Sequence, residues 1–134
     1  MALDPLQEWH RIVAARDAPA IPALLAEDVT FHSPIVHTPQ RGRLVTTGYL
    51  GAALQVFGQD SFRYVREFRG VQCAVLEFSV EIDGIQVNGV DMIAWNEAGL
   101  VVDFKVLLRP LKAVNLIHQK MAQALGLQAA GAPP

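Results

Sequence analysis

The sequence has one cysteine, few charges and no long apolar run, and each of these shortages excludes a class of protein. Cys73 is the single cysteine among 134 residues, so no internal disulfide can form, and we expect a buried, unreactive thiol. No charged start followed by an apolar stretch marks a signal peptide, and no apolar run approaches the ~20 residues that span a bilayer. We therefore expect a cytoplasmic protein that does not enter a membrane.

Charged residues make up only 18% of the chain, with a net charge of −2. Basic and acidic residues are interspersed, so the clustered positive field that binds nucleic acid or an anionic membrane is not expected. Apolar residues make up 51%. A large apolar fraction under a thin charged surface indicates an interior cavity, or a face covered by a second copy of the chain.

Helical spacing of apolar residues dominates the first part of the chain. Asp4 stands before Pro5, with Gln7 three residues after Asp4, which is the pattern of a capped helix with proline in its first turn. Three helices are predicted here: the first over 5–16, the second from a cap at Asp17 to Glu27-Asp28, and the third over 44–57. A strand over 29–32 and a loop over 33–43 separate the second helix from the third.

From Phe62 onward the apolar period changes to two, which predicts an antiparallel meander of four strands ending near Arg109. Asp83-Gly84 is a hairpin signal between two of them, and Pro110 opens a last helix. This order predicts an α+β fold, a cone in which three N-terminal helices pack in the concave face of a curved antiparallel sheet. We expect one domain over 1–128 and a disordered C-terminal tail over 129–134.

Three stretches of the chain resemble the nuclear-transport-factor-like superfamily, which includes ketosteroid isomerases and polyketide-cyclase-like proteins. They are residues 16–31, Ser33-Pro34 followed by Arg41-Gly42, and 90–101. The resemblance implies a cystatin-like roll, covers about residues 5 to 109, and leaves the C-terminal helix as an addition. It is specific for the fold and not for an activity, because this scaffold carries many unrelated chemistries.

The resemblance also implies roles for single residues. Asp91 falls where the isomerases keep a protonated aspartic acid that donates a hydrogen bond to the substrate's oxygen. Their general base falls at Ser33, and their oxyanion tyrosine falls near Trp9. A serine without a neighbouring base cannot abstract a proton from carbon, so steroid isomerisation by the known mechanism is not expected.

Asp91 is the strongest candidate on chemical grounds as well. Both faces of its strand are largely apolar, so its carboxyl group must be paired with a basic residue or protonated in a cavity. His32 and His37 flank the long loop, and either could supply a base, or be an ordinary loop histidine. With Asp28 they fit no standard ligand spacing, so we expect no metal and no cofactor.

Aromatic and apolar side chains, together with Ser33, are expected to line the cavity or to fill the core. They are Trp9, Phe31, Ser33, Tyr49, Phe57, Phe78, Ile93, Phe104, Val106 and Leu108.

The leading hypothesis is a protein that binds a small hydrophobic organic ligand and catalyses isomerisation or cyclisation of a carbonyl compound by proton transfer. A non-catalytic binding module and a dimerisation module with a filled cone are the alternatives. A homodimer through the outer face of the sheet is expected, because apolar residues on both faces require a second cover.

Overall fold

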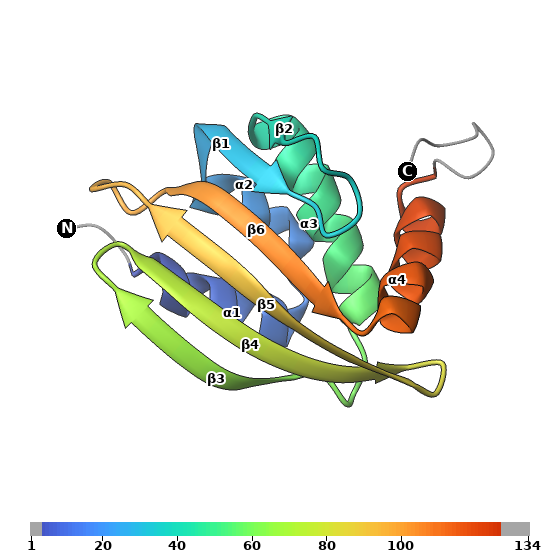
Figure 1. The fold of residues 1–134 in the computed structure, drawn as a ribbon. Coiled ribbons are helices and arrows are strands. Elements are labelled where there is room, and N and C mark those ends of the chain that lie inside the picture. The colour runs from blue at the N-terminus through green and yellow to red at the C-terminus, as the bar shows by residue number, and fades with distance from the viewer. Residues whose placement is uncertain (1–3, 127–134) are drawn as a thin grey trace.

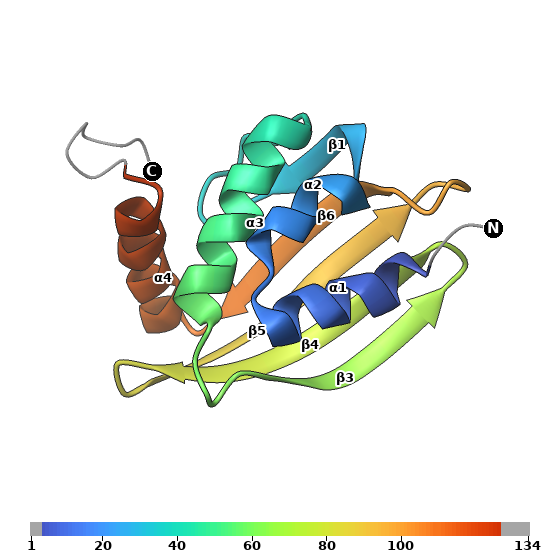
Figure 2. The same cartoon turned by 180° about the vertical axis from the view of Figure 1, so that it is seen from behind.

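A computed structural model describes residues 4–126 and shows a curved sheet with helices on its concave side (Figures 1 and 2). The helices are α1 (Pro5–Ala15), a 3-10 turn η1 (Ala18–Ala20), α2 (Ile21–Leu24), α3 (Arg43–Phe57) and α4 (Leu111–Ala124). The strands are β1 (Leu25–His32), β2 (Gln40–Arg41), β3 (Arg63–Gly70), β4 (Cys73–Ile82), β5 (Ile85–Trp95) and β6 (Val101–Arg109). This is the predicted α+β roll with a cystatin-like fold.

The strands form one sheet in the order β2-β1-β6-β5-β4-β3. The four long strands from β3 to β6 pair with their sequence neighbours in antiparallel hairpins, as the period-two pattern predicted. β1 runs parallel to β6, which places Phe31 beside Phe104 on the concave face. The prediction of a wholly antiparallel sheet is wrong at this one pairing.

Alternation of buried and exposed residues is clear on β4 and β5. Leu76 and Phe78 on β4 are buried, and so are Asp91 and Ile93 on β5. Side chains of a strand point alternately to its two faces, so Asp91 belongs to the face that the helices cover. Figure 2 shows α1 and α3 lying across that face.

The N-terminal end of α1 forms as the sequence predicted. Asp4 is the N-cap residue, and its Oδ1 accepts a hydrogen bond from the backbone N–H of Leu6 at 3.0 Å. The helix buries Leu6, Trp9 and Ile12 against the sheet. Trp9 thereby becomes part of the concave side.

The second helix is shorter than predicted. It ends at Leu24, and β1 begins at Leu25, which pairs with Val101 and is fully buried. Sheet pairing therefore overrides the helical spacing of this stretch. Asp17 makes no side-chain capping bond.

Two further differences concern β2 and Cys73. β2 is a two-residue strand inside the predicted loop. Cys73 is exposed at the start of β4, so the prediction of a buried thiol is wrong.

A second cluster of apolar side chains fixes α4 at one end of the sheet. Ala113 and Ile117 of α4 are buried with Val56, Val80 and Val87. The predicted tail over 129–134 lies outside the described residues. Within residues 4–126, no helix is both long enough and apolar enough to cross a membrane.

Candidate active site

A cavity of about 650 Å³ opens between the concave face of the sheet and helices α1 and α3. A volume of this size suits a small organic molecule. Its lining is largely apolar, with a few polar groups from α1, the loop after α3, and strands β3 and β5. The lining residues are Trp9, His10, Val13, Ala14, Arg16, Phe31, Leu50, Ala53, Leu54, Phe57, Gly58, Gln59, Asp60, Phe62, Arg63, Tyr64, Phe78, Asp91, Phe104 and Val106.

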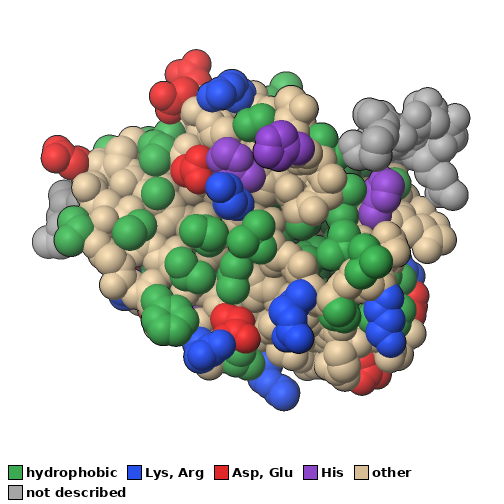
Figure 3. Space-filling view, in the orientation of Figure 1, with side chains coloured by type: hydrophobic (Ala, Val, Ile, Leu, Met, Phe, Trp, Pro, Cys, Tyr) green, Lys and Arg blue, Asp and Glu red, His purple; other side chains and the backbone are tan. Residues whose placement is uncertain are grey.

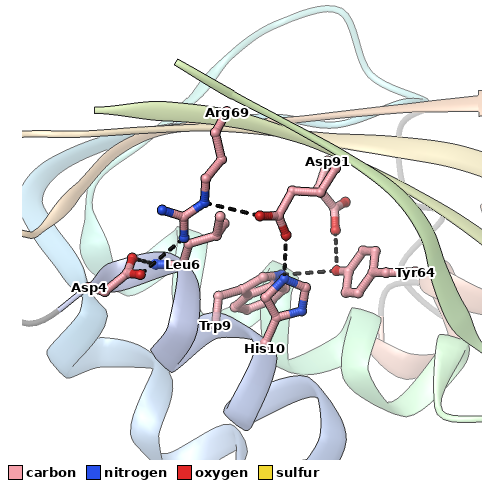
Figure 4. Close-up of polar contacts among 8 residues, drawn as sticks. Asp4, Leu6, Trp9, His10, Tyr64, Arg69 and Asp91 are labelled. Atoms are coloured by element: carbon pink, nitrogen blue, oxygen red, sulfur yellow. Dashed lines mark hydrogen bonds and ion pairs between the residues drawn. The ribbon is translucent and has the colours of Figure 1, made fainter. Parts of the chain in front are cut away.

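Three side chains form a hydrogen-bonded chain on one wall of this cavity. The hydroxyl of Tyr64 donates to Oδ2 of Asp91 at 2.5 Å. The indole N–H of Trp9 donates to the same hydroxyl oxygen at 3.0 Å. Figure 4 shows the side chains of Trp9 and Asp91 meeting at the Tyr64 hydroxyl. Because Trp9 donates to the Tyr64 oxygen, the hydroxyl proton of Tyr64 points toward Asp91.

Burial changes the proton affinity of both acidic groups in this chain. Asp91 is 6% exposed, and burial raises the pKa of its carboxyl group to about 7, against the lowering effect of hydrogen bonds from Tyr64 and Trp9. Burial, and then the neighbouring Asp91, raise the pKa of the Tyr64 phenol well above its usual value. Tyr64 therefore stays protonated near neutral pH, and Asp91 has a substantial protonated population.

His10 is a further polar group in the cavity wall. Its Nε2 lies 3.0 Å from Oε1 of Glu67 on β3, and its ring packs edge-on against Tyr64 with ring centroids 5.1 Å apart. Hydrogen bonds from His10 and Arg69 lower the pKa of Glu67. Since a carboxylate only accepts hydrogen bonds, Nε2 carries the hydrogen, and Nδ1 of neutral His10 keeps its lone pair.

The model of the SnoaL-like domain family matches residues 6–104. The chain belongs to the SnoaL-like family. It lies in the nuclear-transport-factor-like superfamily, as its sequence indicated.

Similar solved structures agree with this assignment. A steroid delta-isomerase from Pseudomonas aeruginosa is 35% identical over 94% of this chain and 92% of that chain, with a TM-score of 0.87. An uncharacterised protein with a cystatin-like fold from Silicibacter pomeroyi is 36% identical over 89% of this chain and 83% of that chain, with a TM-score of 0.82.

An epoxide hydrolase/cyclase-like enzyme of pyran ring formation in salinomycin is 17% identical over 78% of this chain and 88% of that chain, with a TM-score of 0.64, which shows the fold alone. No curated protein sequence matches the chain.

Most of the predicted wall residues lie in or beside the cavity of this SnoaL-like domain. Seven of the predicted residues line the cavity: Trp9, Phe31, Phe57, Phe78, Phe104, Val106 and Asp91. Ser33 and Tyr49 line a smaller adjoining cavity of about 70 Å³ against α4. Ile93 belongs to the main core, and Leu108 packs in the cluster around α4, so neither lines a cavity.

The two histidines considered as bases, His32 and His37, line neither cavity and are not in contact with Asp91. His32 extends from the other face of β1, because Phe31 takes the inward position. Its Nε2 lies 2.9 Å from Oδ1 of Asp103. His37 is exposed in the loop after β1. Ser33 accepts hydrogen bonds from the backbone N–H groups of Ile35 and Val36, which hold the same loop.

Sequence analysis missed Tyr64, Glu67 and His10. A strict period of two places Tyr64 and Phe68 on one face of β3, but the pairing with β4 shifts between Tyr64 and Arg66. This irregularity turns Phe68 outward, where it is 57% exposed. The apolar Phe62 two residues before Tyr64 was the available signal for its inward direction.

The described part of the chain offers no obvious place for a metal ion. Within residues 4–126, no three His, Cys, Asp or Glu side chains gather closely enough to share one. The polar groups that line the cavity include hydrogen-bond donors, one buried carboxyl group and one histidine.

Proposed function

We propose that this SnoaL-like domain binds a small hydrophobic carbonyl compound and catalyses its isomerisation or cyclisation by proton transfer. The observation that carries the proposal is the Trp9–Tyr64–Asp91 chain on the wall of an apolar cavity. A relative of 35% identity named as a steroid delta-isomerase supports the same class of chemistry.

Asp91 is the group proposed to bind the carbonyl oxygen. Tyr64 occupies Oδ2 of Asp91, which leaves Oδ1 for a ligand. A protonated carboxyl group donates its hydrogen to an oxygen that gains negative charge as the carbon-bound proton leaves. The raised pKa of Asp91 keeps that proton available up to about pH 7.

His10 is the group proposed to accept the proton from carbon. Its Nδ1 lone pair is available because Glu67 engages Nε2, and both His10 and Asp91 line the same cavity. The C–H electrons become the double bond of an enol whose oxygen is held by Asp91. His10 then returns the proton to another carbon. Alternatively, the enol carbon attacks a second carbonyl group of the same molecule and closes a ring; His10 gives its proton to the oxygen of that group, and the first carbonyl group re-forms with its proton left on Asp91.

The proton acceptor thus differs from the aspartate of known ketosteroid isomerases, whose position Ser33 occupies. Ser33 lies in the wall of the adjoining cavity and accepts only backbone hydrogen bonds from its own loop. Isomerisation in this chain is therefore assigned to His10 with Glu67.

The first test measures turnover of β,γ-unsaturated cyclic ketones, from one ring to the four rings of a steroid, by the ultraviolet absorbance of the conjugated product. Loss of deuterium from α-deuterated ketones is followed by mass spectrometry. We expect turnover with at least one ketone. The variants Asp91→Leu and His10→Gln should each lower kcat by about 10²-fold or more, since one loses an oxyanion donor and the other the base.

His32→Gln is the matched control, because His32 also pairs with a carboxylate but on the opposite face of the sheet. It should keep wild-type turnover. Equal losses in the His10 and His32 variants would contradict the assignment of the base. Ligand binding without turnover or deuterium loss would favour the non-catalytic binding module.

A further inference from the structure

The arginines divide into two groups by their contacts. Six of the eight contact an acidic side chain, another side-chain oxygen or a backbone carbonyl oxygen; they are Arg11, Arg41, Arg43, Arg66, Arg69 and Arg109. Arg16 and Arg63 have no such partner among residues 4–126, and both line the cavity. The two arginines without a partner are thus the two that line the cavity, and both are exposed.

Arg16 is held at the cavity by the backbone around it. It is the C-cap residue of α1 in the left-handed conformation, with φ 52°, and its backbone N–H bonds to the carbonyl groups of Ile12 and Val13. Its side chain lies across Gly58 at the end of α3, where an added Cβ would stand 3.1 Å from Nε. The absence of a side chain at Gly58 therefore leaves room for Arg16.

Arg63 is the second arginine of the cavity lining, and it is exposed. It is the first residue of β3 and directly precedes Tyr64. Asp60 also lines the cavity, but no ion pair joins its carboxyl group to Arg16 or to Arg63. Two arginines and one aspartate, all three exposed, leave an excess of positive charge at the wall, although the chain as a whole carries −2.

We infer that the ligand of this cavity carries a carboxylate, which Arg16 and Arg63 bind while its carbonyl oxygen lies at Asp91. The inference rests on the proposed function and narrows its substrate class to hydrophobic oxo acids. A guanidinium group matches a carboxylate with two parallel hydrogen bonds, and neither exposed arginine has a competing acidic partner among residues 4–126. An electrically neutral ligand would leave both guanidinium groups to water, since both arginines are exposed.

The test compares ligands that differ only in the carboxylate. The probes are 2-naphthol with 6-hydroxy-2-naphthoate, and 4-hydroxybiphenyl with 4′-hydroxybiphenyl-4-carboxylate, whose hydroxyl oxygens imitate an enol. Kd is measured by calorimetry at about pH 6, below the pKa of Asp91. In at least one pair, the acid should bind about tenfold more tightly than the neutral phenol. Salt at about 0.5 M should reduce this advantage, because salt screens the attraction between the carboxylate and the arginines.

The double variant Arg16→Gln/Arg63→Gln should remove the advantage and leave the Kd of 2-naphthol within about twofold of wild type. Arg66→Gln makes the same change of charge on the same strand, but Arg66 pairs with Glu77 away from the cavity. It should keep the advantage. The unchanged affinity for 2-naphthol also shows that each variant is folded.

Phenols that bind without any preference for the acids would overturn this inference and leave the proposed function standing. So would a preference that survives the double variant, or one that Arg66→Gln also removes. Failure of every probe to bind the wild-type protein would overturn both proposals.

Discussion

The proton on Asp91 is held more tightly in the folded protein than in the unfolded chain. Burial raises its pKa from 3.8 to about 7, and the neighbouring Tyr64 hydroxyl only partly compensates for the lost water. A buried carboxylate without a basic partner is costly, and no arginine or lysine pairs with Asp91 among the described residues. The same burial that prepares Asp91 as a donor therefore makes stability depend on pH.

The variant Asp91→Asn should separate these effects. Between pH 3.8 and about 7, the unfolded chain has released the proton while the folded protein keeps it. The contribution of Asp91 to wild-type stability therefore falls as pH rises through this window, by roughly 4 kcal/mol in total, and is level above it. Asparagine does not titrate, so the variant should gain stability relative to wild type over the window, as measured by urea unfolding.

Asp28→Asn is the control, because Asp28 is exposed on β1. Its stability should follow the wild-type curve across the window. Parallel curves for Asp91→Asn and wild type would contradict the raised pKa.

Among the elements, β5 shapes the cavity through the close approach of its neighbours at Gly89. Gly89 pairs with Phe78 on β4 and with Leu108 on β6. A Cβ built on Gly89 would lie 2.6 Å from Cζ of Phe78 and 2.6 Å from the carbonyl oxygen of Leu107. The glycine thus allows the Phe78 ring to lie over β5 and form a wall of the cavity.

Gly89→Ala should destabilise the protein by about 1–3 kcal/mol, because the Leu107 backbone cannot move aside without disturbing β6. Thermal and urea unfolding measure the loss. Gly51→Ala on α3 is the control, since nothing lies within 4 Å of its added Cβ. It should instead stabilise the protein by about 0.5–1 kcal/mol, as alanine favours a helix. Equal effects at the two positions would contradict the crowding at Gly89.

On the scale of the whole molecule, the outer face of the sheet carries exposed apolar side chains among charged ones. Figure 3 shows apolar side chains spread over the middle of this face. Phe68, Met92 and Leu107 are exposed there, beside Val75 and Val90. An antiparallel sheet with apolar residues on both faces is suited to a second cover, and a second copy of the chain is the proposed one.

Wild-type protein should therefore sediment as a dimer at micromolar concentration, and Leu107→Glu should sediment as a monomer, because it places a carboxylate at the centre of the apolar face. Leu44→Glu is the matched control, since Leu44 is 90% exposed on α3, away from the sheet. A wild-type monomer, or a dimer that survives Leu107→Glu, would contradict this interface.

Local patterns in the sequence determined much of this architecture. Period-two alternation predicted β4 and β5 and grouped Asp91 with Ile93 on one face of its strand, because side chains alternate along a strand in residue order. Which of the two apolar faces of β5 the helices cover was decided by the tertiary structure. The cap at Asp4 was equally local. The family resemblance added the cystatin-like roll and the importance of Asp91.

Only the tertiary structure decided which groups meet. Tyr64 reaches Asp91 across β4, and His10 reaches Glu67 from α1, over 27 and 57 residues of sequence. Alternation gives the face of a side chain but neither its partner strand nor the place where an irregular pairing reverses the face, as it does after Tyr64. The parallel pairing of β1 with β6 is likewise long-range, and it places His32 outside the cavity.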